Sequence, residues 1–105
     1  MSFPARMRIK KSAYEAMLRH FEGEYPRQAC GLLSGFGNRA YHFYAIRNLN
    51  IRRDHLILDP RQVSRTEVSI YRRYQRVVGF CFSTGEKGLK DPWFISGSHL
   101  PVDQS

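Results

Sequence analysis

The chain has 105 residues, which is enough for one compact domain and too few for two. Hydrophobic residues make up 42% of it and aromatic residues 13%, which excludes a wholly disordered chain, and no apolar run approaches the roughly 20 residues of a membrane-spanning helix. The formal net charge is +8, and the excess lies within residues 1–85. We expect a basic, soluble domain with no membrane partner; Met1–Arg6 lacks a secretory signal pattern, which predicts a cytoplasmic protein.

The N-terminal part of the chain predicts a strand followed by a helix. Met7–Lys10 alternates apolar and basic residues, as a short strand does. Ser12 and Glu15 form a Ser-x-x-Glu pattern, which predicts a capping box at the start of the helix. Gly23 and Pro26 are expected to end it. One apolar stripe should face the core, consisting of Tyr14, Met17, Leu18 and Phe21.

The next segment predicts a β-hairpin. Ala29–Leu33 is a short apolar run ended by Ser34 and Gly35, which is typical of a strand buried on both faces. Phe36–Asn38 has the composition of a turn, and Ala40–Ile46 supplies the aromatic and aliphatic residues of a second strand. We expect these two strands to pair.

Beyond the hairpin, Arg47–Asp54 predicts a loop and His55–Leu58 a third strand. Asp59 then offers an N-cap and Pro60 suits the first helical position, so a second helix should run to about Arg76. Its partly apolar face is expected to consist of Val63, Ser64, Glu67, Val68, Tyr71 and Tyr74.

Val77–Phe82 is apolar and begins with β-branched residues, which predicts a central strand. The resulting order β-α-β-β-β-α-β indicates an α+β, or mixed α/β, fold in which two helices flank a central sheet. The pattern fades after Gly85. We therefore expect one domain over residues 1–85 and a divergent, flexible tail over residues 86–105.

The cysteines and histidines carry no clear catalytic pattern. Cys30 and Cys81 both lie in apolar sequence, which predicts buried free thiols rather than a disulfide, metal ligands or a nucleophile. His20 and His42 are expected to be packed or surface side chains, and His55 is uninformative.

Two motifs resemble the JAMM/MPN (JAB) domain family of zinc isopeptidases, in its bacterial type. The first is Ala29-Cys30-Gly31-Leu32-Leu33-x-Gly35, and the second, about 45 residues later, is Val77-Val78-Gly79-Phe80. His20, Tyr25-Pro26, Asn48 and Leu58-Asp59-Pro60 extend the resemblance over residues 7–85. It implies a cytidine-deaminase-like three-layer arrangement with a truncated C-terminal part, because the family fold normally continues well beyond the second motif.

Active members of that family cut ubiquitin-type isopeptide bonds or release groups from the C-terminus of small ubiquitin-like sulfur carriers. The resemblance implies a mechanism in which two imidazoles and a carboxylate hold Zn²⁺ with one position open to water. The metal lowers the pKa of that water and a glutamate accepts its proton.

The resemblance places inert groups at these positions. Gln28 stands at the general-base position, and its amide cannot accept a proton at neutral pH. The zinc-ligand positions hold Phe82, Thr84 and Ile95, while Ser83 is retained from the motif and Pro92 replaces its second serine. This implies no catalytic residue, no bound zinc and a pseudoenzyme that acts as a binding or scaffold module for a ubiquitin-like or acidic protein.

Two alternatives stay open. One is an active zinc peptidase with a relocated site at His99 and Asp103, near Ser96 and Ser98. The other is a small nucleic-acid-associated protein, whose basic clusters would be Arg47, Arg52 and Arg53 and, with Tyr71 and Tyr74 interleaved, Arg72, Arg73 and Arg76. The simpler interpretation of the second cluster is that its arginines complement the helix dipole and its tyrosines face the core. Strand edges left open by a short C-terminus would favour a homodimer.

Overall fold

The computed structural model describes residues 8–25, 27–50, 56–83 and 93–95. Its elements in chain order are β1 (Arg8–Ile9), α1 (Lys11–Glu24), β2 (Cys30–Phe36), β3 (Arg39–Ile46), α2 (Pro60–Arg72), β4 (Arg76–Ser83) and β5 (Trp93–Ile95). Two helices and one mixed sheet confirm the predicted α+β class. Within the described ranges, no helix combines the length and the apolar character needed to cross a membrane.

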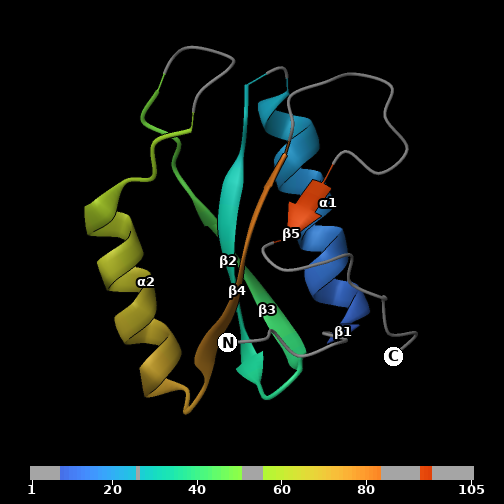
Figure 1. The fold of residues 1–105 in the computed structure, drawn as a ribbon, viewed down its shortest axis with the longest axis vertical. Helices are drawn as coiled ribbons and strands as arrows, with labels where there is room; N and C mark the ends of the chain where they lie inside the picture. The colour runs from blue at the N-terminus through green and yellow to red at the C-terminus, as the bar shows by residue number, and fades with distance from the viewer. Residues whose placement is uncertain (1–7, 26, 51–55, 84–92, 96–105) are drawn as a thin grey trace.

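The sheet has the strand order β1-β3-β2-β4-β5, and the two helices lie on its opposite sides (Figure 1). β1 and β3 run parallel, and the pairs β3–β2, β2–β4 and β4–β5 are antiparallel. β4 is an interior strand between β2 and β5, as predicted for Val77–Phe82. Part of the expected tail belongs to this sheet, because Trp93–Ile95 pair with Cys81–Ser83.

The predicted hairpin forms between β2 and β3, although β2 extends beyond Ser34 and Gly35 to Phe36. Phe36 pairs with Arg39, so Gly37 and Asn38 make the connecting turn, and Gly37 has a φ of 54° that glycine adopts without strain. β2 is buried along nearly its whole length, as its apolar sequence predicts.

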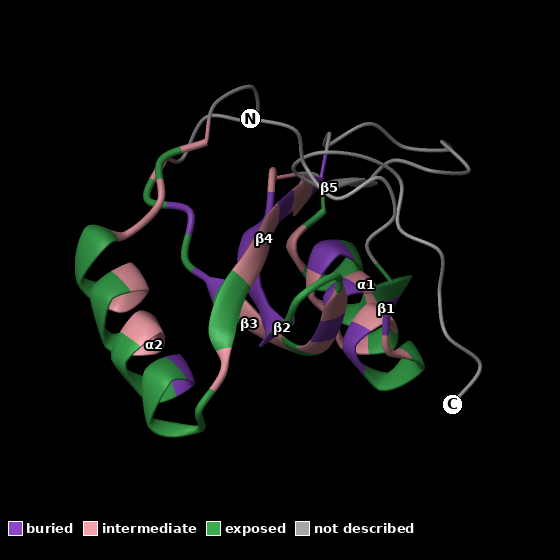
Figure 2. Ribbon diagram, turned by 60° about the horizontal axis from the view of Figure 1, so that its bottom comes forward, coloured by how far each residue is buried: buried purple, intermediate pink, exposed green. Residues whose placement is uncertain are grey.

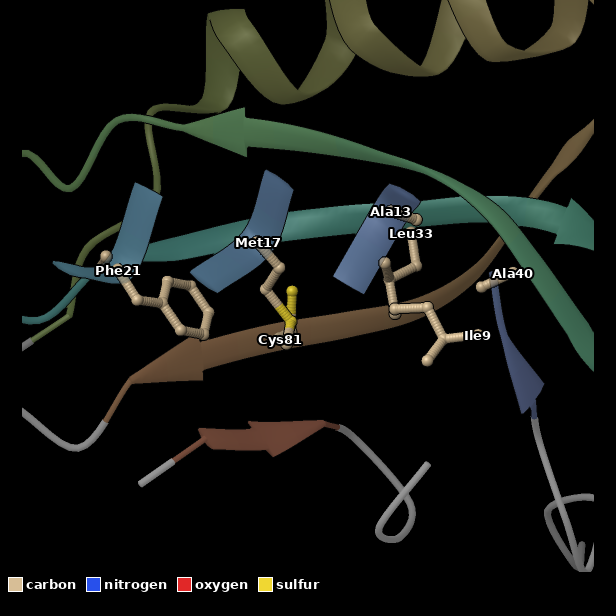
Figure 3. Packing of buried hydrophobic residues seen from close by; sticks show 8 residues of the cluster. Ile9, Ala13, Met17, Phe21, Leu33, Ala40 and Cys81 are labelled. Atoms are coloured by element: carbon tan, nitrogen blue, oxygen red, sulfur yellow. The ribbon is translucent and has the colours of Figure 1, made fainter. Parts of the chain in front are cut away.

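The face of the sheet toward α1 carries the larger core cluster (Figure 3). Met17 and Phe21 of the predicted helical stripe are fully buried there, together with Ala13, and Tyr14 and Leu18 pack at its margin. The other buried members come from the strands and the start of β2: Ile9, Ala29, Leu33, Ala40 and Cys81. The helix passes through Gly23 and ends at Glu24.

The two helices begin in different ways. The capping box predicted at Ser12 is wrong: α1 starts at Lys11, its N-cap is Lys10, and no side chain caps it. Ser12 lies inside the first turn, two positions too late to act as an N-cap. At α2 the prediction is confirmed, because the Asp59 carboxylate accepts hydrogen bonds from the backbone N–H groups of Arg61 and Gln62.

The face toward α2 carries a smaller core of Cys30, Leu32 and Ile46, against which partly buried side chains pack: Leu56, Leu58, Val63, Phe80 and Phe82. Ile70 is the one α2 residue that is fully buried. The face predicted for this helix is largely wrong, because Val68, Tyr71 and Tyr74 are 50%, 63% and 87% exposed. The helix contacts the sheet through the neighbouring row that contains Val63 and Ile70, and it ends at Arg72 rather than near Arg76.

The strand predicted at His55–Leu58 is also wrong over its described part. Leu56–Leu58 form no strand, and Leu58 makes only an isolated bridge to Asn48. His55 and the end of the predicted loop lie outside the described residues.

Candidate functional site

The start of β2 and the end of β4 meet at one end of the sheet, and this junction holds the described positions singled out by the resemblance. Cys30 pairs with Phe82, and the next pair outward joins Ala29 and Ser83. Gln28 directly precedes that pair. The structure therefore brings Gln28, Phe82 and Ser83 together from positions more than 50 residues apart. Thr84, Gly85 and Pro92 lie outside the described residues, and Ile95 pairs with Cys81 in β5.

Ser83 has a structural role at this junction. Its Oγ accepts a hydrogen bond of 2.9 Å from the backbone N–H of Ala29, and its own N–H donates to the Ala29 carbonyl at 2.9 Å. The side chain is only 3% exposed. These two bonds pair the strands at the end of the sheet, and the hydroxyl oxygen serves as a partner for a buried backbone N–H.

Phe82 faces the α2 side of the sheet and packs in the smaller core cluster. Its ring centroid lies 5.7 Å from that of Phe80, at an interplanar angle of 34°. A side chain with no lone pair at this point supplies packing where an imidazole would supply a metal ligand.

The junction is held by Asn48, whose side chain is nearly fully buried. Its Nδ2 donates to the Gln28 carbonyl at 2.9 Å, and its Oδ1 accepts from the backbone N–H groups of Asn50 and Ile57, at 3.0 Å each. One amide thus ties the segment after β3 to the start of β2. The resemblance included Asn48 but gave it no role, and no periodicity in the polar segment around it would have revealed one.

Arg27 reinforces the same connection from outside. Its guanidinium donates to the carbonyls of Asn48 and Asn50, at 2.8 and 3.0 Å. Sequence reasoning did not single out this arginine. Its contacts are to main-chain oxygens far along the chain, which no local pattern specifies.

Both cysteines are buried free thiols, as predicted. Burial, and then the charge of Glu24, raises the pKa of Cys30 to about 11, and its Sγ donates to the Ile46 carbonyl at 3.3 Å. Burial, and then the neighbouring Cys30, also raises the pKa of Cys81. Burial therefore favours the neutral form of both thiols, which makes them poor nucleophiles.

The described histidines also match the prediction of packed or surface side chains. His20 is half-buried, with its ring centroid 5.8 Å from that of Phe43, and burial lowers its pKa. His42 is exposed on β3. The residues of the alternative zinc site, His99, Asp103, Ser96 and Ser98, lie outside the described residues.

The donor set at the junction does not fit zinc. A tetrahedral zinc site needs imidazole, thiolate or carboxylate ligands, whereas Gln28, Phe82 and Ser83 offer an amide, a hydrocarbon ring and a hydroxyl already used by the backbone. The described ranges contain no group of three or more His, Cys, Asp or Glu side chains that could hold a metal. No catalytic step through a metal can be derived from these residues.

A second surface is formed by the outer side of α2 and its C-terminal turn. Arg72, Arg73 and Arg76 are exposed there, as are Arg61 and Arg65, which sequence reasoning missed. The prediction that Tyr71 and Tyr74 face the core is wrong, because both rings lie mostly in solvent. Of the other predicted basic cluster, Arg47 is exposed, while Arg52 and Arg53 lie outside the described residues.

Comparison with known proteins supports the fold and adds no activity. No protein-family model and no curated protein matches the sequence. Among solved structures, the chain is similar to the solution structure of protein DSY2949 from Desulfitobacterium hafniense, with a TM-score of 0.68 and 25% sequence identity. The match covers 80% of this chain and 60% of that protein, so the present chain spans less than two thirds of its relative's length.

Proposed function

We propose that this chain is a JAMM/MPN-like domain that acts as a binding or scaffold module rather than as a hydrolase. One observation carries the proposal: at the junction of β2 and β4, Ser83 is bonded to the Ala29 backbone while Phe82 packs in the core. At two of the positions that the resemblance singles out, the side chains of Phe82 and Ser83 therefore pack in the core and bond to the backbone, and neither is ionisable.

Hydrolysis of an isopeptide bond needs an activated water and a group that accepts its proton. Gln28 is an amide and cannot serve as that base, and its backbone carbonyl is held by Asn48. A domain without this chemistry can still bind another molecule through its surface. We propose a ubiquitin-like protein as the partner, the class on which the active relatives implied by the resemblance act.

The first test restores the metal site. The variant Gln28→Glu/Phe82→His/Thr84→His/Ile95→Asp is expected to bind zinc in stoichiometric amount, measured by mass spectrometry, and the native chain is expected to bind none. Phe82→Leu is the control for lost packing in the α2-side core, and circular dichroism checks that each variant folds. Stoichiometric zinc in the native chain, or a folded four-residue variant without zinc, would contradict the proposal.

The second test concerns turnover and binding. The purified native chain is expected to leave ubiquitin-like conjugates intact in the presence of zinc and to bind a ubiquitin-like protein in a calorimetric titration. Cleavage of a conjugate would establish an enzyme, and the absence of binding would remove the proposed partner class.

A further inference from the structure

The segment from α2 to the start of β4 carries half of the net charge of the chain. Residues 60–77 contain five arginines and one acidic residue, Glu67, which gives +4 of the total +8. All five arginines are exposed. We call this the α2 surface and define it by Arg61, Arg65, Val68, Tyr71, Arg72, Arg73, Tyr74 and Arg76.

The arginines of the α2 surface form a track along the helix. Arg61, Arg65 and Arg72 are spaced four and seven residues apart, which places them on one side of the helix over about 16 Å at 1.5 Å per residue. A shallow open depression lies between the last two, lined by Ser64, Arg65, Val68, Ser69 and Arg72. In Figure 2 the outer side of α2 appears almost wholly exposed.

These guanidinium groups have no partner among the residues that the structure describes. Within the described ranges, none of the five arginines makes an ion pair or a side-chain hydrogen bond. Positive charge also affects the neighbouring end of the sheet, where burial and then the charges of Arg73 and Lys10 lower the pKa of His42. The surface is therefore suited to a polyanion.

Tyr74 gives the α2 surface a second feature. The backbone N–H of Tyr74 donates to the Tyr71 carbonyl at 2.9 Å and that of Gln75 to the Ile70 carbonyl at 3.2 Å, the bonding pattern of a Schellman turn. Tyr74 occupies its left-handed position with a φ of 59°, where glycine is usual. Its side chain is 87% exposed, so packing does not explain a tyrosine there.

The turn that presents Tyr74 is anchored to the sheet. Gln75 accepts a hydrogen bond of 2.7 Å from the fully buried Ser34 hydroxyl of β2. The backbone at Tyr74 is thus anchored in a conformation that costs free energy, and the side chain of Tyr74 lies in solvent. Strained, exposed positions of this kind are found at binding sites.

We infer that the α2 surface binds single-stranded nucleic acid, with the arginines on phosphates and Tyr71 and Tyr74 stacked on unpaired bases. Arginine forks match phosphate oxygens, and aromatic rings stack on any base. An acidic protein would use the same arginines but not the rings, because the face of an aromatic ring carries negative potential and does not attract carboxylates. Paired bases in a duplex would likewise be hidden from the tyrosines.

The test measures binding of the full chain to fluorescently labelled dT12 and U12 by anisotropy, between 50 and 200 mM salt. Each phosphate contact should contribute about −0.7 to the slope of log K against log salt concentration, so five contacts predict about −3.5. Arg72→Ala/Arg73→Ala should make this slope shallower by about 1.4 units. The matched control Lys11→Ala/Arg19→Ala removes the same charge from exposed positions on α1 and should leave the slope nearly unchanged.

The variant Tyr74→Gly distinguishes a loss of base stacking from a loss of folding. It should weaken binding about 5- to 150-fold, the effect of losing one stacked base, while the melting temperature rises because the left-handed position is relieved. Tyr25→Ala removes an exposed tyrosine elsewhere and should leave the affinity unchanged.

Three outcomes would overturn the inference. The first is that the chain does not bind dT12 or U12 at 50 mM salt. The second is that it binds duplex DNA as tightly as the single strand. The third is that Tyr74→Gly leaves the affinity unchanged while polyglutamate competes as well as dT12. The last would identify an acidic-protein surface instead. Changes at Gln28 and Phe82 lie outside the α2 surface, so this test is independent of the proposed function.

Discussion

Asn48 contributes more to the structure than its place in a polar segment suggests. Its amide makes three hydrogen bonds to the backbone of Gln28, Asn50 and Ile57. Because buried main-chain groups need partners, an amide side chain that both donates and accepts is the simplest way to hold an irregular segment against the start of a strand.

Asn48→Ala should destabilise the fold by about 2–4 kcal/mol, because it leaves buried main-chain N–H and C=O groups without partners. Asn48→Asp should lose less stability than Asn48→Ala, since a carboxylate still accepts hydrogen bonds from the two N–H groups. Urea denaturation gives the free energies of unfolding. Asn38→Ala, in the exposed hairpin turn, is the control and should change stability by less than about 0.5 kcal/mol. An equal effect at both positions would refute the role of Asn48.

His20 should make stability depend on pH. Burial lowers its pKa below the ordinary 6.5, against the opposing effects of Glu24 and of a backbone hydrogen bond at Cys30. The unfolded chain therefore binds a proton before the folded chain does, and stability should fall as pH drops below about 6.5 toward the lowered pKa. His20→Phe should flatten this part of the curve of unfolding free energy against pH.

Because desolvation is the main cause of this shift, moderate salt should leave the slope in place. A variant without His20 that keeps the full pH dependence between neutral and mildly acidic pH would assign the effect to another group.

At the scale of the elements, the two helices differ in how they are started and how they are held. α2 has a side-chain cap from Asp59 and a proline at its first position, whereas α1 has neither. α1 instead depends on packing, because Ala13, Met17 and Phe21 are all buried against the sheet. Local capping thus matters most for the helix that packs least.

Asp59→Ala should lower the free energy of unfolding by about 1 kcal/mol, because the Asp59 side chain caps α2. Ser12→Ala should change it by less than about 0.5 kcal/mol, because Ser12 forms no cap. Thermal unfolding of the two variants under identical conditions makes the comparison. A loss at Ser12 as large as that at Asp59 would show that the capping box forms in solution.

At the scale of the whole molecule, the two sides of the sheet are unequally filled. The α1 side has a continuous buried cluster from Ile9 to Cys81, while the α2 side has a smaller cluster and one fully buried helical residue, Ile70. Burial of apolar area is the main favourable contribution to stability, so the α2 layer should open at lower free energy than the α1 layer.

Native-state hydrogen exchange tests this difference. Amides of α2 should exchange through an opening of lower free energy than those at the centre of α1, and urea should affect the two sets differently at low concentration. Equal protection of both helices would show that the layers unfold as one unit.

Much of the element order could be predicted from the sequence because its signals are local. The start of α2 follows from Asp59 and Pro60, and the hairpin from Gly37 and Asn38 between two apolar runs. The errors have local causes as well. Ser12 and Glu15 match a capping pattern, but the N-cap is Lys10, two residues before Ser12. His55–Leu58 has the composition of a strand, yet its described residues gain only one bridge.

The chain alone determined the chemistry available at the junction, because the amide of Gln28 and the hydrocarbon ring of Phe82 supply neither a general base nor a usual zinc ligand, however the chain folds. Only the tertiary structure decided how these residues are used, since the bond between Ala29 and Ser83 spans 54 positions and no local rule specifies it. It also decided which row of α2 faces the sheet. That choice depends on how the helix packs against the sheet, and it leaves Tyr71 and Tyr74 in solvent.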